Sequence, residues 1–134
     1  MNEGHYFPWH FEGNEFTVSI LIQEAEEGGL FEFVSDIRKP GDENLEIVKS
    51  ILKGSRDRVR SLKLKPGDMQ LFKERYSLHR VTRVQGKINR IIAFPSYTTH
   101  PRMMNRPEHS IQVYGKSLPI QNERENVRSD NLID

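Results

Sequence analysis

Two histidines and one carboxylate in this sequence have the types and spacing of a metal-ligand set. His10 and Glu12 are two residues apart, and residues i and i+2 of an extended segment point to the same side. His79 opens an apolar, strand-like segment much later in the chain. Two histidines and one carboxylate on one face of a metal form the facial triad of non-heme Fe(II) oxygenases, which leaves coordination positions open. The alternatives are a surface pair at His10 and Glu12 and a strand histidine bonded to backbone at His79.

Arg90 is an isolated charge that enters an apolar run, Asn89-Arg90-Ile91-Ile92. A turn at Gly86-Lys87 predicts a hairpin that would place Arg90 on the strand beside that of His79. From there its guanidinium could hold a carboxylate through two parallel hydrogen bonds. A core-facing arginine without an acid would be costly, so a bound acid would explain it. The alternative is that Arg90 faces solvent on the outer side of the sheet.

Short apolar stretches between turn residues predict a mainly β fold that must position these groups. The predicted strands cover residues 16–23, 30–34, 59–64, 69–72, 79–84 and 88–94, with a weaker strand at 110–114. One helix interrupts them, capped by Asp42 and ended by Gly54, with an apolar face formed by Leu45, Val48, Ile51 and Leu52. Many short strands with one inserted helix suggest a sandwich or jelly roll.

Composition and charge narrow the class of protein. The chain has 134 residues, which predicts one domain; we expect a jelly-roll core over residues 1–116 and a loose polar tail over 117–134. Lys+Arg 20 and Asp+Glu 19 leave a net charge of +1, which gives no reason to expect nucleic acid or a membrane as partner. Neither a membrane span nor an apolar signal core is visible, and the absence of cysteine excludes disulfides. These features favour a cytoplasmic protein.

Several motifs together are similar to the C-terminal half of the Fe(II)/2-oxoglutarate-dependent dioxygenases. In chain order they are His10-Phe11-Glu12, Gly28-Gly29, Pro66-Gly67-Asp68, Leu78-His79-Arg80-Val81 and the segment from Gly86 to Arg90. The closest likeness is to the bacterial branch with free-amino-acid hydroxylases and related radical halogenases. The resemblance implies a double-stranded β-helix (jelly roll), Fe(II) as cofactor and 2-oxoglutarate as co-substrate. It also implies hydroxylation by O₂ of a small polar, amino-acid-like substrate.

Carried over residue by residue, the resemblance assigns His10, Glu12 and His79 as iron ligands. It assigns Arg90 to the distal carboxylate of 2-oxoglutarate, and no catalytic residue beyond the ligands. The family's usual carboxylate is Asp, whereas this chain has Glu12. The halogenase variants have Gly or Ala there, which lets chloride bind iron, so Glu12 argues against halogenation.

The resemblance also implies that the family's usual N-terminal region is lacking, since only nine residues precede His10. We therefore expect a fragment or a reduced relative with an open sheet edge, which pairing with a second copy would be one way to close. The main alternative function is a non-catalytic cupin-like binding module or degenerate fragment. A zinc hydrolase ranks last, because the sequence shows no separate general base.

Other residues near the motifs carry weaker expectations. Strand parity predicts core packing for Trp9 and a pocket position for Tyr6, and it places Thr17 and Ser19 on one face near the site. Three histidines fit no ligand spacing and are expected to be ordinary: His5, His100 and His109. Residues 102–106 are expected to form either a lid or a loop.

Overall fold

Antiparallel strands dominate the computed structural model, which describes residues 1–97, 101, 104, 106–123 and 130–133. The strands are β1 (Phe7–His10), β2 (Phe16–Gln23), β3 (Glu27–Gly28), β4 (Phe31–Val34), β5 (Arg60–Leu62), β6 (Met69–Phe72), β7 (Leu78–Val81), β8 (Val84–Gln85), β9 (Ile91–Ala93) and β10 (Ser96–Tyr97). The helices are α1 (Leu45–Leu52), the 3-10 helix η1 (Glu74–Tyr76), α2 (Pro107–Tyr114) and α3 (Pro119–Asn122). Among the described residues, no helix is long and apolar enough to cross a membrane.

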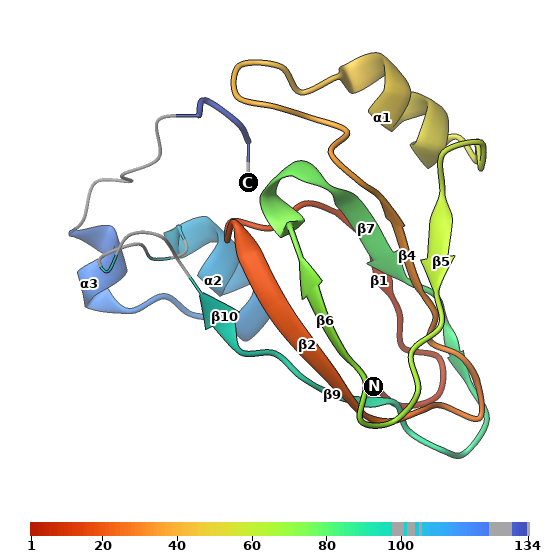
Figure 1. Cartoon of the computed structure of the whole chain (residues 1–134). Helices are drawn as coiled ribbons and strands as arrows, with labels where there is room; N and C mark the ends of the chain where they lie inside the picture. The colour runs from red at the N-terminus through yellow and green to blue at the C-terminus, as the bar shows by residue number, and fades with distance from the viewer. Residues whose placement is uncertain (98–100, 102–103, 105, 124–129, 134) are drawn as a thin grey trace.

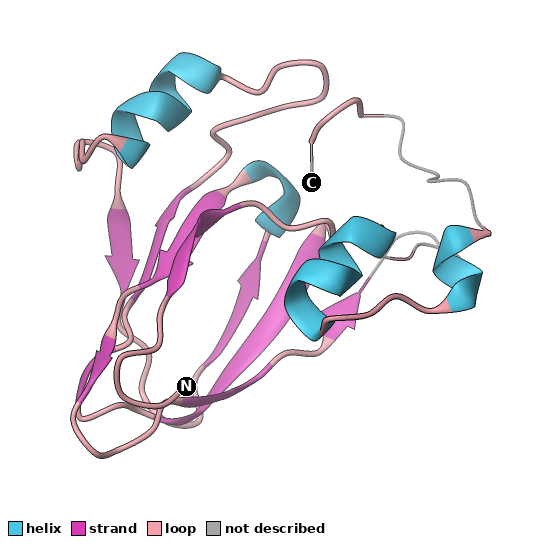
Figure 2. Cartoon of the chain, turned by 180° about the vertical axis from the view of Figure 1, so that it is seen from behind, coloured by secondary structure: helices cyan, strands magenta, loops and turns pink. Residues whose placement is uncertain are grey.

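Two antiparallel sheets form a β-sandwich of the jelly-roll type, which confirms the predicted fold class. The first sheet has the order β1-β7-β4-β5. In the second sheet β2 lies between β6 on one side and both β9 and β10 on the other. Figures 1 and 2 show the two sheets as opposite walls, with α1 outside the first sheet.

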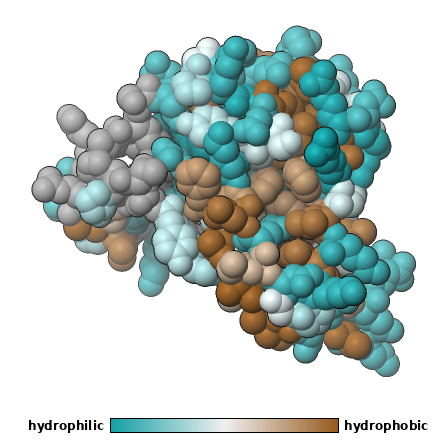
Figure 3. Space-filling model, viewed as in Figure 1, coloured by the Kyte–Doolittle hydropathy of each residue, from teal (hydrophilic) through white to brown (hydrophobic). Residues whose placement is uncertain are grey.

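Strand β2 has the predicted bounds, and its side chains alternate between the inner and outer faces of the second sheet. Thr17, Ser19 and Leu21 are buried on the inner face. In the paired strand β6, Gln70 and Phe72 line the same interior, whereas Met69 and Leu71 are exposed on the outer face. Figure 3 shows apolar surface in the region of β2 and β6. The space between the sheets therefore receives polar groups as well as apolar ones.

The sheets touch through aromatic rings at the centre of the sandwich. The ring of Phe72 in β6 packs edge-on against Phe31 and Phe33 of β4, with centroid separations of 4.9 and 5.6 Å. Phe33 is paired in register with His79 of β7, so the His79 side chain lies on the same inner face. These aromatic rings therefore pack beside His79, the predicted metal ligand.

The main apolar core lies outside the sandwich, between α1 and the outer face of the first sheet. Val34, Ile37, Ile51 and Leu78 form its buried centre. Trp9 packs against this cluster, which confirms the parity argument that it points away from His10. Because this core stabilises the first sheet from outside, the inner face is free to carry polar side chains.

Helix α1 differs from the prediction in the residue that precedes it and in the residues that form its buried face. Asn44, not Asp42, is the residue before the first turn, and the Asp42 carboxylate accepts a hydrogen bond from the Asn44 N–H at 2.9 Å. Leu45 and Leu52 are exposed, because the face that meets the sheet is centred on Ile51 and includes Ile47 and Val48.

The predicted hairpin between the strands of His79 and Arg90 does not form. Strand β7 pairs with β1 and β4, so both of its edges are already occupied, and β9 pairs with β2 in the opposite sheet. The turn at Gly86 carries the chain from one sheet toward the other. A Cβ there would lie 2.4 Å from Glu26 Oε2, which accepts the Lys87 N–H at 2.8 Å.

The C-terminal part differs from two further predictions. Residues 110–114 belong to α2, which begins at Pro107, rather than to a strand. The predicted loose tail contains α3 and, at residues 130–133, a segment docked on η1. There Arg75 forms an ion pair with Asp130 at 2.7 Å, and Leu132 is buried. These contacts join residues far apart in the chain, so the local sequence pattern could not predict that residues 130–133 would pack against η1.

Candidate metal centre

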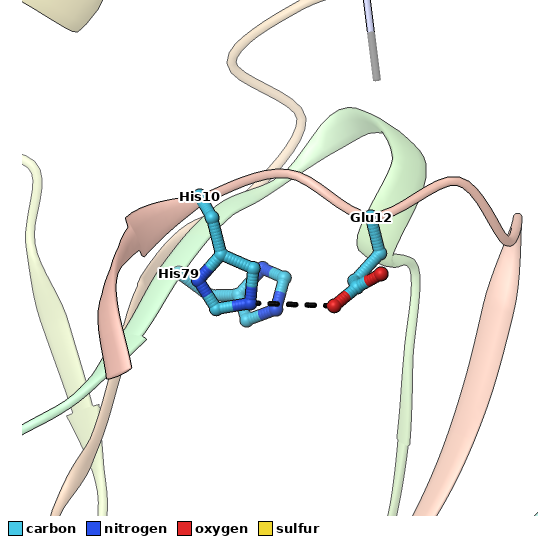
Figure 4. Close-up of side chains that lie close together, drawn as sticks. All are labelled: His10, Glu12 and His79. Atoms are coloured by element: carbon cyan, nitrogen blue, oxygen red, sulfur yellow. Dashed lines mark ion pairs between the residues drawn. The ribbon is translucent and has the colours of Figure 1, made fainter. Parts of the chain in front are cut away.

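His10, Glu12 and His79 come together inside the sandwich, at one end of β1 and β7. Each offers one ligand atom, and these atoms lie within 4.8 Å of one another. Register pairing of His10 with His79 across the two strands sets their ring centroids 4.2 Å apart. Glu12 follows β1 in a loop, and its Oε1 lies 3.5 Å from His10 Nε2 (Figure 4).

Backbone carbonyls fix the orientation of both imidazoles. Nδ1 of His10 lies 2.7 Å from the carbonyl oxygen of Pro8, and Nδ1 of His79 lies 3.0 Å from that of Ser77. Because a carbonyl oxygen only accepts, Nδ1 carries a proton in each ring and Nε2 is the candidate ligand atom. Such outer partners orient histidine ligands in metal sites.

The protonation state of His79 suits a metal site. Burial, reinforced by the nearby His10, lowers the pKa of His79 to about 4, so its ring is neutral at physiological pH. Burial is the largest single influence on His10 and Glu12 and disfavours the charged form of each. Their contact with each other, together with the Pro8 carbonyl beside His10 and the further histidines near Glu12, outweighs burial, so the pKa of His10 is raised and that of Glu12 is lowered. Two imidazole nitrogens and one carboxylate oxygen match the ligand preference of a divalent transition metal. The three residues could therefore bind a metal.

A cavity of about 270 Å³ between the sheets contains this group. Besides the three candidate ligands, its polar lining includes Thr17, Ser19, Gln70, Glu74, Arg90 and His109. The cavity confirms the predicted position of Thr17 and Ser19. Tyr6 is not among its lining residues; it is exposed, and its ring packs against the Arg83 guanidinium at 4.5 Å.

Arg90 reaches the cavity from the second sheet rather than from a strand beside His79. It is 4% exposed, so it does not face solvent. Its Nη1 has no hydrogen-bond partner, and no acid pairs with it in the described part of the chain. Gly29 makes room for it: at φ +62°, a Cβ on residue 29 would lie 2.8 Å from Arg90 Cδ.

Two residues that line the cavity were not predicted from the sequence as part of the site. Glu74, on η1, accepts a hydrogen bond from the Thr17 hydroxyl, and burial raises its pKa to about 7. Only its proximity to the strand of His79 could have drawn attention to it. His109 was expected to be ordinary, but its Nε2 lies 3.7 Å from Glu12 Oε2. No local signal links these two residues, because the contact depends on where α2 docks.

The remaining expectations about this region concern His100 and residues 102–106. His100 and most of 102–106 lie outside the described residues.

Comparison with known proteins adds one match. A model of the halogenase D family matches residues 1–113, a span that contains His10, Glu12, His79 and Arg90. A search of curated proteins found no match. The family match covers most of the chain and suggests an enzyme with oxidoreductase chemistry. The chain therefore belongs to the halogenase D family.

Proposed function

We propose that this protein is an Fe(II)/2-oxoglutarate-dependent oxygenase that hydroxylates a small polar, amino-acid-like substrate. One observation carries the proposal: a buried arginine that pairs with no acid among the described residues shares a cavity with a two-histidine, one-carboxylate group. Fe(II) held by His10, Glu12 and His79 supplies, when bound with 2-oxoglutarate, oxidation by O₂ coupled to decarboxylation of the co-substrate. The protein supplies the binding groups and the shielded cavity.

Arg90 supports a carboxylate-bearing co-substrate. Burial lowers the pKa of its guanidinium, and an uncompensated buried charge costs several kcal/mol. A carboxylate in the cavity offsets that cost through two parallel hydrogen bonds. Ser19 Oγ is also buried, has no hydrogen-bond partner in the part of the chain that the structure describes, and lines the same cavity, so it offers a further donor.

Aromatic rings shield the histidine side of the site from water. Phe72 packs edge-on against the His79 ring at 5.1 Å between centroids, and Phe31 lies 5.7 Å away on a neighbouring strand. Excluding water strengthens electrostatic interactions inside the cavity and limits side reactions.

Glu12 supports hydroxylation rather than halogenation, although the matched family is named for a halogenase. In the halogenase variants that the sequence resembles, a small residue takes the carboxylate's place and leaves room for a halide. Here a carboxylate oxygen lies among the candidate ligand atoms. We therefore expect an oxygen atom rather than chlorine in the product, even in chloride buffer.

Anaerobic titration of Fe(II) with 2-oxoglutarate tests the proposal through the visible charge-transfer band of the chelate. We expect the band in the wild type and its loss in His79→Ala. Arg90→Met should raise the 2-oxoglutarate concentration needed for half-maximal absorbance at least tenfold. Arg83→Met is the matched control, because Arg83 is exposed and lies outside the cavity.

Two results would refute the proposal. A folded wild type that forms no band would leave a non-catalytic binding module as the better description. A band that survives in His79→Ala would remove that histidine from the site. Mass spectrometry of turnover products with and without chloride then separates hydroxylation from halogenation.

A further inference from the structure

We propose that His109 is a positioning residue that holds the Glu12 carboxylate so that only one of its oxygens is presented to the metal. The inference rests on the proposed metal site. Glu12 lies between two imidazoles: Oε1 is 3.5 Å from His10 Nε2, and Oε2 is 3.7 Å from His109 Nε2. The two oxygens of one carboxylate therefore have different neighbours.

A glutamate at this position needs such a contact more than an aspartate would. Its longer side chain has one more rotatable bond, and ordering it costs more conformational entropy. Glu12 also lies in the loop after β1 rather than in the paired strand, and its side chain is 27% exposed. Within the described part of the chain, its ion-pair contacts are with His10 and His109.

The position of His109 is set by a helix that is itself anchored. The neighbouring residue Ser110 is buried, and its hydroxyl accepts a hydrogen bond from Gln121 Nε2 at 2.6 Å. Tyr114 of the same helix lines the cavity, so α2 forms part of the wall over the site. The His109 side chain is 23% exposed, which leaves its contact with Glu12 only partly accessible to water.

The contact of Oε2 with His109 has a consequence for coordination. A carboxylate with both oxygens free can bind a metal through both, which consumes an open position. With Oε2 turned toward His109, Oε1 remains as the oxygen that faces His10. The arrangement keeps positions open for a co-substrate that chelates through two atoms.

The test measures Fe(II) affinity by anaerobic calorimetry, without 2-oxoglutarate and without turnover. Removing outer partners of metal ligands typically weakens binding by about 10–100-fold, so we expect a loss in that range for His109→Ala. His109→Gln should restore most of the affinity, because its amide can donate to Oε2. His5→Ala is the control, since His5 is an exposed histidine outside the cavity.

A double-mutant cycle separates positioning from a general structural role. The shorter side chain in Glu12→Asp draws the carboxylate away from α2, so His109→Ala should cost much less Fe(II) affinity in that background. Equal losses in both backgrounds, or a Gln variant as weak as the Ala variant, would overturn the inference. A wild type that binds no Fe(II) would overturn the proposed function as well, whereas wild-type affinity in His109→Ala would overturn the inference alone.

Discussion

Glu74→Gln should stabilise the metal-free protein at alkaline pH and change little at acidic pH. Glu74 is 8% exposed, and the Thr17 hydroxyl donates a hydrogen bond to it. Burial raises the pKa of Glu74 from 4.5 to about 7; the Thr17 hydrogen bond opposes the rise, and the nearby Glu12 carboxylate adds to it. Glutamine keeps the acceptor for Thr17 and removes the charge.

The sign of the effect follows from proton linkage. The folded protein holds the Glu74 proton more tightly than the unfolded chain does, so the resulting stability is fully present below about pH 4.5. It is lost as the pH rises through about 7. At about 1.4 kcal/mol per pH unit, a pKa difference of this size is worth about 3 kcal/mol. For a chain of this length, that corresponds to roughly 10 °C in Tm.

Thermal unfolding followed by circular dichroism, with a chelator present, measures the effect from pH 5 to 8.5. We expect Glu74→Gln and the wild type to melt within a few degrees at pH 5 and to separate by roughly 10 °C at pH 8.5. Glu3→Gln, at an exposed position, controls for the loss of one negative charge. A Tm difference that stays constant across this range would refute the assignment of Glu74 as a buried, proton-binding carboxyl.

Three further predictions test other parts of the structure. Gly29→Ala should destabilise the protein by about 1–3 kcal/mol through its left-handed backbone, and it should weaken 2-oxoglutarate binding because the new Cβ would lie 2.8 Å from Arg90 Cδ; unchanged 2-oxoglutarate titrations would contradict this. Since the pKa of His10 is raised, Fe(II) binding near neutral pH should release a proton, and affinity should rise with pH; calorimetry in buffers of different ionisation enthalpy detects the release, and buffer-independent heats would count against it. Leu78→Ala should lower the free energy of unfolding in urea by about 2–5 kcal/mol, because Leu78 is buried under α1. Leu71→Ala, on the exposed face, should lower it far less; similar losses for both variants would show that the core does not lie under α1.

The sequence by itself determined several of the strands and the residue types of the candidate ligand set. The β-branched run at residues 16–23 became β2 with the predicted bounds, and 69–72 became β6. Both predictions depend on residue types and turn signals within a few residues, which the chain carries locally. The types and spacing of His10, Glu12 and His79, taken together with the other motifs, predicted a metal-ligand set, although Glu12 lies in the loop after β1 rather than in the strand.

Only the tertiary structure decided how distant segments meet around that site. A turn at Gly86 looks the same in sequence whether it closes a hairpin or crosses between sheets, and occupied edges on β7 decided for the crossing. That crossing brings Arg90 to the cavity from the second sheet, and the docking of α2 brings His109 to Glu12. Such contacts join residues far apart in the chain, and their geometry depends on strand pairing and packing that local sequence patterns do not encode.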